Sequence, residues 1–114
     1  MGTVLPFPQR DAGGQQQQTG FTRFELNRIV DLYGRMVAAG LWKDYAIAFE
    51  PGAAAFWAFR RTAENPEVRI EKRPGARQGA WALIGESGQV LRRGPELGSI
   101  LAPLERRLLK LVAG

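Results

Sequence analysis

The chain has neither cysteine nor histidine among its 114 residues. Without cysteine it can form no disulfide and no thiolate metal site, which suits a reducing compartment. Without histidine it lacks the most common neutral-pH acid and base and the most common transition-metal ligand. An enzyme built on this chain would have to work with Asp, Glu, Lys, Tyr or Ser alone.

The sequence also lacks a segment that predicts entry into a membrane. No apolar run approaches the roughly 18 residues of a spanning helix, and the N-terminus has no basic region followed by an apolar stretch. We therefore expect a cytoplasmic protein without membrane contact. Its length, with 45% hydrophobic and 24% charged residues, suits one folded domain.

Residues 1–20 differ from the rest of the chain in composition. They contain Pro6, Pro8, Gly13, Gly14 and the glutamine run 15–18, and they offer few groups that could join a core. This composition predicts a disordered tail. The folded domain is expected over residues 21–114.

A helix is predicted to begin directly after the tail. Thr22 and Glu25 have the spacing of a capping box, and Phe21 and Leu26 have that of a hydrophobic staple. Gly40 is placed to end the helix in the left-handed conformation. The expected apolar stripe consists of Leu26, Ile29, Val30, Tyr33 and Val37.

From Trp42 the hydrophobic period changes to two, which is typical of strands. Short Pro-, Gly- and Asn-containing connections favour an antiparallel meander of about five strands. The predicted strands cover residues 44–50, 53–60, 68–73, 79–84 and 89–92.

The connection between the first two of these strands decides which side chains share a face. With three or five connecting residues, one face holds Tyr45, Ile47, Phe49, Trp57 and Phe59. The other face then holds Ala46, Ala48, Phe56 and Ala58, joined by Ala80 and Ala82. A two- or four-residue connection mixes the sets, and we favour the first arrangement because it yields one dense aromatic core face.

The last segment predicts a second helix after Gly94, with Pro95 at its first position and a kink or break at Pro103. Its apolar face consists of Leu97, Ile100, Leu101, Leu104, Leu108 and Leu111. The predicted fold class is therefore α+β: an N-terminal helix, an antiparallel meander and a C-terminal helix, with both helices on the aromatic sheet face.

Positive charge is concentrated in the second half of the chain. The charges of residues 1–57 cancel, so the whole net charge of +5 lies after residue 57. A basic surface of this kind predicts contact with DNA or RNA, and alternation places Arg69 and Arg73 on one face. The predicted basic contacts are Arg60, Arg61, Arg69, Lys72, Arg73, Arg77, Arg92 and Arg93. The competing interpretation is a set of solvated charges that Glu67 and Glu71 partly neutralise.

Phe56 is the one aromatic residue expected on the small-residue face, where it could stack an unpaired base as sheet-based RNA binders do. More often such a face is covered by a helix or by a second subunit.

The chain shows no motif of an enzyme. The loop 74–79 lacks the Lys and Ser/Thr that end a P-loop, and the second glycine of Gly85–Gly88 comes one residue too early for a nucleophile elbow. We therefore expect no catalytic residues, no metal site and no cofactor.

Three segments resemble a family of small uncharacterised alpha-proteobacterial proteins, the domain of unknown function 2794. They are residues 32–40, residues 44–47 and the basic run 69–74, and the similarity spans roughly Phe21 to Glu105. The resemblance implies a bacterial cytoplasmic protein and assigns no activity.

Together these patterns predict a small, basic, non-enzymatic binding protein, a nucleic-acid-binding regulator that uses its C-terminal half. The alternative is a protein-interaction module or homodimer that docks through the exposed sheet face, a sheet edge or the last helix.

Overall fold

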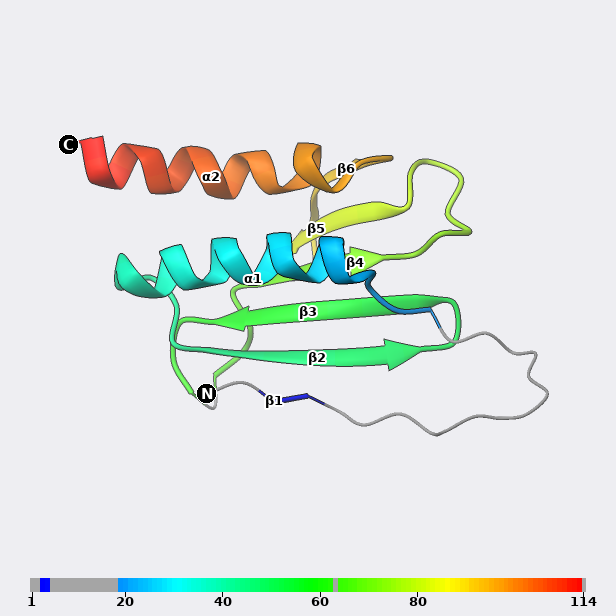
Figure 1. The fold of residues 1–114 in the computed structure, drawn as a ribbon, viewed down its shortest axis with the longest axis horizontal. Coiled ribbons are helices and arrows are strands. Elements are labelled where there is room, and N and C mark those ends of the chain that lie inside the picture. The colour runs from blue at the N-terminus through cyan, green and yellow to red at the C-terminus, as the bar shows by residue number, and fades with distance from the viewer. Residues whose placement is uncertain (1–2, 5–18, 63, 114) are drawn as a thin grey trace.

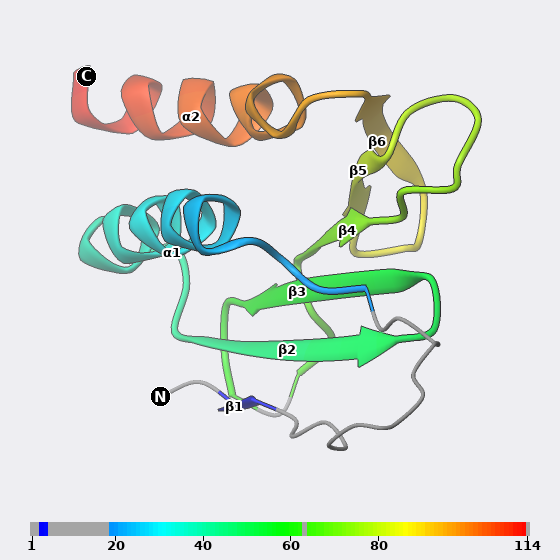
Figure 2. The same ribbon diagram turned by 45° about the vertical axis from the view of Figure 1, so that its right-hand side comes forward.

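The computed structural model describes residues 3–4, 19–62 and 64–113. It has two layers, a six-stranded sheet and two helices that lie on the same side of it (Figures 1 and 2). The chain order is β1 (Thr3–Val4), α1 (Arg23–Ala38), β2 (Asp44–Glu50), β3 (Ala53–Phe59), β4 (Val68–Lys72), β5 (Trp81–Gly85), β6 (Val90–Gly94) and α2 (Leu97–Ala113).

The sheet order follows the chain, and β2 to β6 form the antiparallel meander that the sequence predicts. The predicted α+β fold class is confirmed. One strand was not expected: β1 pairs in parallel with β2, with Thr3 opposite Ala46. A disordered tail was predicted for residues 1–20, and Thr3–Val4 depart from that prediction, while residues 1–2 and 5–18 lie outside the described residues.

Both ends of α1 form as the local sequence predicts. The Thr22 hydroxyl accepts from the Glu25 amide at 3.1 Å, and the Glu25 carboxylate accepts from the Thr22 amide at 2.8 Å. At the other end Gly40 has a φ of 82°, and the amide of Leu41 donates to the Met36 carbonyl at 2.9 Å. This is a Schellman ending, which satisfies carbonyls that the helix leaves free.

The buried stripe of α1 is rotated relative to the prediction. Ile29, Leu32 and Met36 are buried against the sheet, whereas Val30 and Val37 are exposed. More than half of the residues in this helix are apolar, so the periodicity alone did not identify the row of side chains that packs against the sheet.

The predicted pairing register of β2 and β3 is wrong. Pro51 and Gly52 form a two-residue turn in which Gly52 has a φ of 78°, as the third position of a type II turn requires. Ile47 therefore lies opposite Phe56, and Ala46 lies opposite Trp57.

This register moves Phe56 into the core and Trp57 out of it. Phe56 is 0% exposed, and its ring stacks on Tyr45 with 5.2 Å between centroids. Trp57 and Phe59 point to the face away from the helices. The turn, and not the aromatic pattern, determines the register, because strands joined by a two-residue connection cannot shift by one residue relative to each other.

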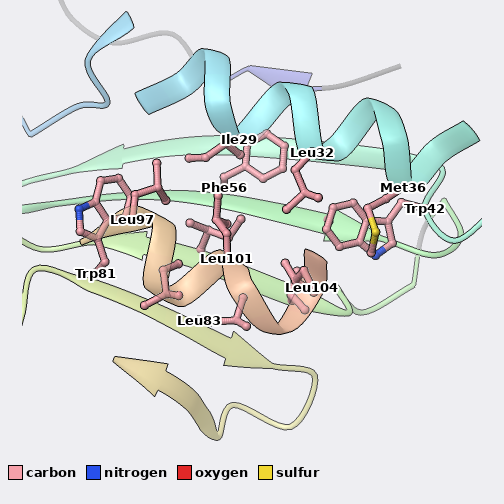
Figure 3. Close-up of a cluster of buried hydrophobic side chains, with 14 of the residues drawn as sticks. Ile29, Leu32, Met36, Trp42, Phe56, Trp81, Leu83, Leu97, Leu101 and Leu104 are labelled. Carbon is pink, nitrogen blue, oxygen red and sulfur yellow. The ribbon is translucent and has the colours of Figure 1, made fainter. Parts of the chain in front are cut away.

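The core lies between the helices and the inner sheet face (Figure 3). It joins Ile29, Leu32, Met36, Trp42, Phe56, Trp81, Leu83, Leu97, Leu101 and Leu104. At one end of it, Glu67 accepts from the Trp42 indole N–H at 2.8 Å and from the Arg107 guanidinium at 2.6 Å. This carboxylate therefore ties the loop after α1 to α2.

Helix α2 runs without a break through Pro103. Five of the six residues of its predicted apolar face are buried, and the exception is Leu111. Leu111 is exposed because the C-terminal end of α2 extends past the ends of the strands (Figure 1).

Candidate nucleic-acid interface

The sheet has a second face, away from α1 and α2, which we call the open face (Figure 2). None of the described residues forms an element that lies on it. The strand registers place two long cross-strand rows there, and at the ends of β2 and β3 two short pairs, Asp44 with Phe59 and Glu50 with Ala53. One row is Ala48, Ala55, Glu71, Ala82 and Arg93, and the other is Ala46, Trp57, Arg69, Ile84 and Val90.

An arginine cluster, defined here as Arg69, Arg73 and Arg93, occupies the half of the open face over β4 to β6. Two of its members share one carboxylate: Arg69 lies 3.1 Å and Arg73 lies 2.9 Å from the same oxygen of Glu71. The third, Arg93, donates to the carbonyl oxygen of Gly79 at 3.4 Å.

Glu71 is 7% exposed, and it is the one charged residue among the described residues that is classed as buried. Burial alone would raise the pKa of this carboxyl, but hydrogen bonds from Arg73 and Arg69 hold its pKa below the usual value. Glu71 is therefore ionised at neutral pH. Two guanidinium groups on one carboxylate leave a net positive charge on the half of the open face over β4 to β6, whereas Asp44 and Glu50 of β2 lie on the other half.

Trp57 orients the first of these arginines. The guanidinium carbon of Arg69 lies 5.2 Å from the centroid of the Trp57 ring. A guanidinium over an indole face gains a cation–π attraction, and Arg makes this contact more often than Lys. Arg69 is thus held from two sides, by the indole and by the carboxylate of Glu71.

The structure brings only part of the predicted basic set together. Arg69, Arg73 and Arg93 share the open face, as alternation along β4 predicted for the first two. Arg77 lies exposed in the loop between β4 and β5, at the end of the sheet where Arg73 leaves β4. It makes no ion pair with any of the described residues.

Lys72 and Arg92 point to the helix side of the sheet, and each has a structural partner there. Lys72 lies 2.7 Å from Glu25 and donates to the carbonyl of Gly20 at 2.9 Å. Arg92 donates to the carbonyl of Ser99 at 3.4 Å. These contacts place both residues outside the open face.

Arg60 and Arg61 lie near the opposite end of the sheet. Arg60 pairs with Glu86 at 3.1 Å, and Arg61 pairs with Glu64 at 3.2 Å. Arg60 and Glu86 also line a shallow polar depression with Glu64 and Asn65. Because Arg60 and Arg61 each have an acidic partner, this end of the sheet has no excess positive charge.

The aromatic member of the predicted site is corrected from Phe56 to Trp57. Phe56 is in the core, and Trp57 is the aromatic residue beside the arginines. A predicted two-residue connection at Pro51-Gly52 would have identified Trp57 from the sequence, because that register places Trp57 on the small-residue face.

Within residues 3–4, 19–62 and 64–113, no group of three acidic, His or Cys side chains is arranged to hold a metal ion. No helix in the same part of the chain is long and apolar enough to span a membrane.

The fold and the open face define a small α+β protein in which two helices cover one side of a meander and arginines occupy the other. Residues 19–101 match the family model of a protein of unknown function, DUF2794. Because the match covers more than half of the chain, the protein belongs to this family. Comparisons with curated proteins and with solved structures find no match.

Proposed function

We propose that the protein binds nucleic acid through the open face of its sheet. The observation that carries the proposal is the pair of guanidinium groups that share the Glu71 carboxylate beside Trp57. A single carboxylate cannot neutralise two arginines, so this part of the face keeps a positive charge at a fixed position.

The neighbouring residues support an anionic partner. Arg93 lies on the same face and Arg77 lies at its end, so the cations extend beyond the Glu71 pair. Nucleic-acid phosphates are recognised mainly by Arg and Lys, and guanidinium groups match them in bidentate geometry. The net charge of +5, all of it after residue 57, adds a long-range attraction to a polyanion.

The test measures binding of labelled oligonucleotides by fluorescence anisotropy across a range of salt concentrations. The variant carries Arg73→Gln, Arg77→Gln and Arg93→Gln together. It leaves Arg69 in place, so Glu71 keeps one partner. Each lost phosphate contact lowers the slope of log K against log salt by about 0.7 to 0.9, so the variant should lose about 2 units of slope.

A matched control carries Arg23→Gln, Arg28→Gln and Arg106→Gln, which removes the same charge from exposed positions on the helices. We expect the control to lose much less affinity than the open-face variant. Equal losses of affinity in both variants would show that only the total charge of the protein matters, and would overturn the proposal. So would the absence of binding by the wild type at about 50 mM salt.

A second candidate is association with another protein through α2. Leu109 and Leu111 are 64% and 50% exposed near the end of this helix. These two leucines lie on different sides of α2, because residues two apart on a helix do not share a face, so each is a separate apolar contact for a partner. In this case the double variant Leu109→Gln, Leu111→Gln would abolish a complex that the open-face variant retains, as measured by sedimentation velocity with the partner recovered from cells.

A further inference from the structure

We infer that the ligand of the open face is a single strand whose unpaired bases stack beside Trp57 and Arg69. This inference rests on the proposed function and narrows it to one class of nucleic acid. Three features of the open face carry it: the Arg69 guanidinium over the Trp57 indole, the second ring of Phe59, and the local positive charge of the arginine cluster.

The first feature is the Arg69 guanidinium over the Trp57 indole, with its carbon 5.2 Å from the ring centroid and a nitrogen 3.1 Å from the Glu71 carboxylate. Unpaired bases stack on aromatic rings and on guanidinium planes, and such stacking tolerates any base because every base has a π face. Phe59 follows two residues after Trp57 on the same face of β3, which places a second ring about 7 Å further along the strand.

The floor of the face is built from Ala46, Ala48, Ala55 and Ala82. Three of these alanines are buried, with Ala48 6% exposed and Ala55 and Ala82 0% exposed, so a base would lie on Trp57 and Phe59 rather than on the sheet itself. Full readout of the base pairs of duplex DNA instead needs an element that enters the major groove. The strands of the open face present no such element among the described residues, and the bases of a duplex are already paired and stacked with one another.

A second copy of this chain is the competing occupant of an apolar, aromatic sheet face. A face-to-face dimer about a twofold axis would bring the same patch together from both subunits. An axis through the arginine cluster would place Arg69, Arg73 and Arg93 near their own symmetry mates. An axis through the middle of the face would instead place them opposite β2 and β3, where Asp44 and Glu50 share this face. The first arrangement is strongly unfavourable because like charges meet across the interface, and the sedimentation experiment below tests the second.

Trp57 itself provides the readout of the test. Trp42 and Trp81 are 1% and 5% exposed, whereas Trp57 is partly exposed on the open face. Quenching of tryptophan fluorescence by an added oligonucleotide therefore reports on Trp57. The titration uses 12-nucleotide single strands of DNA and of RNA, and the matching DNA and RNA duplexes, at about 50 mM salt.

We expect single strands to quench the fluorescence and to bind at least about tenfold more tightly than duplexes. The Trp57 variants lack this fluorophore, so their affinities are measured by the anisotropy of labelled oligonucleotides. Trp57→Phe keeps a ring and should retain most of the affinity. Trp57→Leu keeps an apolar side chain without a ring and should weaken binding about tenfold, within the range found for base–aromatic stacking. The control Phe24→Leu, which removes an exposed ring from α1, should leave binding unchanged.

The outcomes separate this inference from the proposed function. Duplexes that bind as tightly as single strands, without a loss in Trp57→Leu, would overturn the single-strand inference and leave nucleic-acid binding in place. Absence of binding to all four oligonucleotides would overturn both. A concentration-dependent dimer in sedimentation runs that Trp57→Leu dissociates would assign the open face to a second copy and also overturn both.

Discussion

The guanidinium of Arg92 on β6 donates to the carbonyl oxygen of Ser99 in the first turn of α2, at 3.4 Å. Ser99 lies four residues before Pro103, and a proline has no N–H to give to the carbonyl four residues earlier. Arg92 therefore supplies a donor to a helix carbonyl that Pro103 leaves without its usual partner. This contact provides a partner for a carbonyl at the point where α2 continues through Pro103 without the predicted break.

This relationship predicts a non-additive pair of substitutions. Arg92→Ala should cost about 1 kcal/mol of unfolding free energy in the wild type, since it removes one hydrogen bond from a charged donor. In a Pro103→Ala background the helix amide replaces Arg92, so the same change should cost much less. Denaturant unfolding of the two single variants and the double variant measures the coupling. Equal costs in both backgrounds would show that Arg92 does not serve the Ser99 carbonyl.

The capping box of α1 leads to a second prediction. Thr22→Ala removes the hydroxyl that accepts from the Glu25 amide, and it should lower the unfolding free energy by about 1 kcal/mol. Thr62→Ala, at an exposed position in the loop after β3, is the matched control and should change stability little. A Thr22 variant as stable as its control would contradict the cap. Thermal unfolding followed by circular dichroism is sufficient for this comparison.

The two helix ends were predictable because their signals are local. Thr22, Glu25 and Gly40 act on backbone groups within five residues, so spacing along the chain carries the information. The alternation of Arg69 and Arg73 was predictable for the same reason, since the period of a strand is two. These features required no knowledge of which segments meet in space.

The partners of those residues were not predictable in the same way. Glu71 faces both arginines from within β4, but Trp57 meets Arg69 only through the pairing of β3 with β4. Lys72 finds Glu25, which lies 47 residues earlier, through tertiary packing. Which of Arg92 and Arg93 lies on the open face depends on a register irregularity in β6, which no local sequence pattern indicates.

A third prediction concerns the pH dependence that Glu71 contributes. Its pKa is lowered in the folded protein from an ordinary value of 4.5, so its stabilising effect is complete above about pH 4.5 and is lost as the pH falls through the folded pKa. Glu71→Gln should cost about 1–3 kcal/mol at pH 7. The gap between wild type and variant should close in acid.

Glu25 has a pKa shifted in the same direction, because hydrogen bonds from Lys72 and Thr22 outweigh its burial. The wild-type curve alone would therefore mix two groups. The difference between the unfolding free energies of wild type and Glu71→Gln, measured from pH 3 to 7, isolates Glu71. A difference that stayed constant over this range would rule out an ionised Glu71 as the source of the stabilisation.

The fourth prediction concerns Gly79, where the loop after β4 passes against the end of β6. Gly79 has a φ of 125°, and a Cβ added there would lie 2.6 Å from the carbonyl oxygen of Gly94, inside the contact distance of real side chains. Gly79→Ala should therefore cost more than the roughly 1–2 kcal/mol of an unfavourable backbone conformation alone.

Gly88→Ala is the matched control, because Gly88 has a φ of 88° and open space around it, so it carries the backbone cost without the contact. The Gly79 variant should also weaken oligonucleotide binding, since its carbonyl accepts from Arg93 and its loop carries Arg77. Equal destabilisation by the two alanines would show that the loop can move away from β6 at no cost, and the position of Arg93 would then not depend on this close approach.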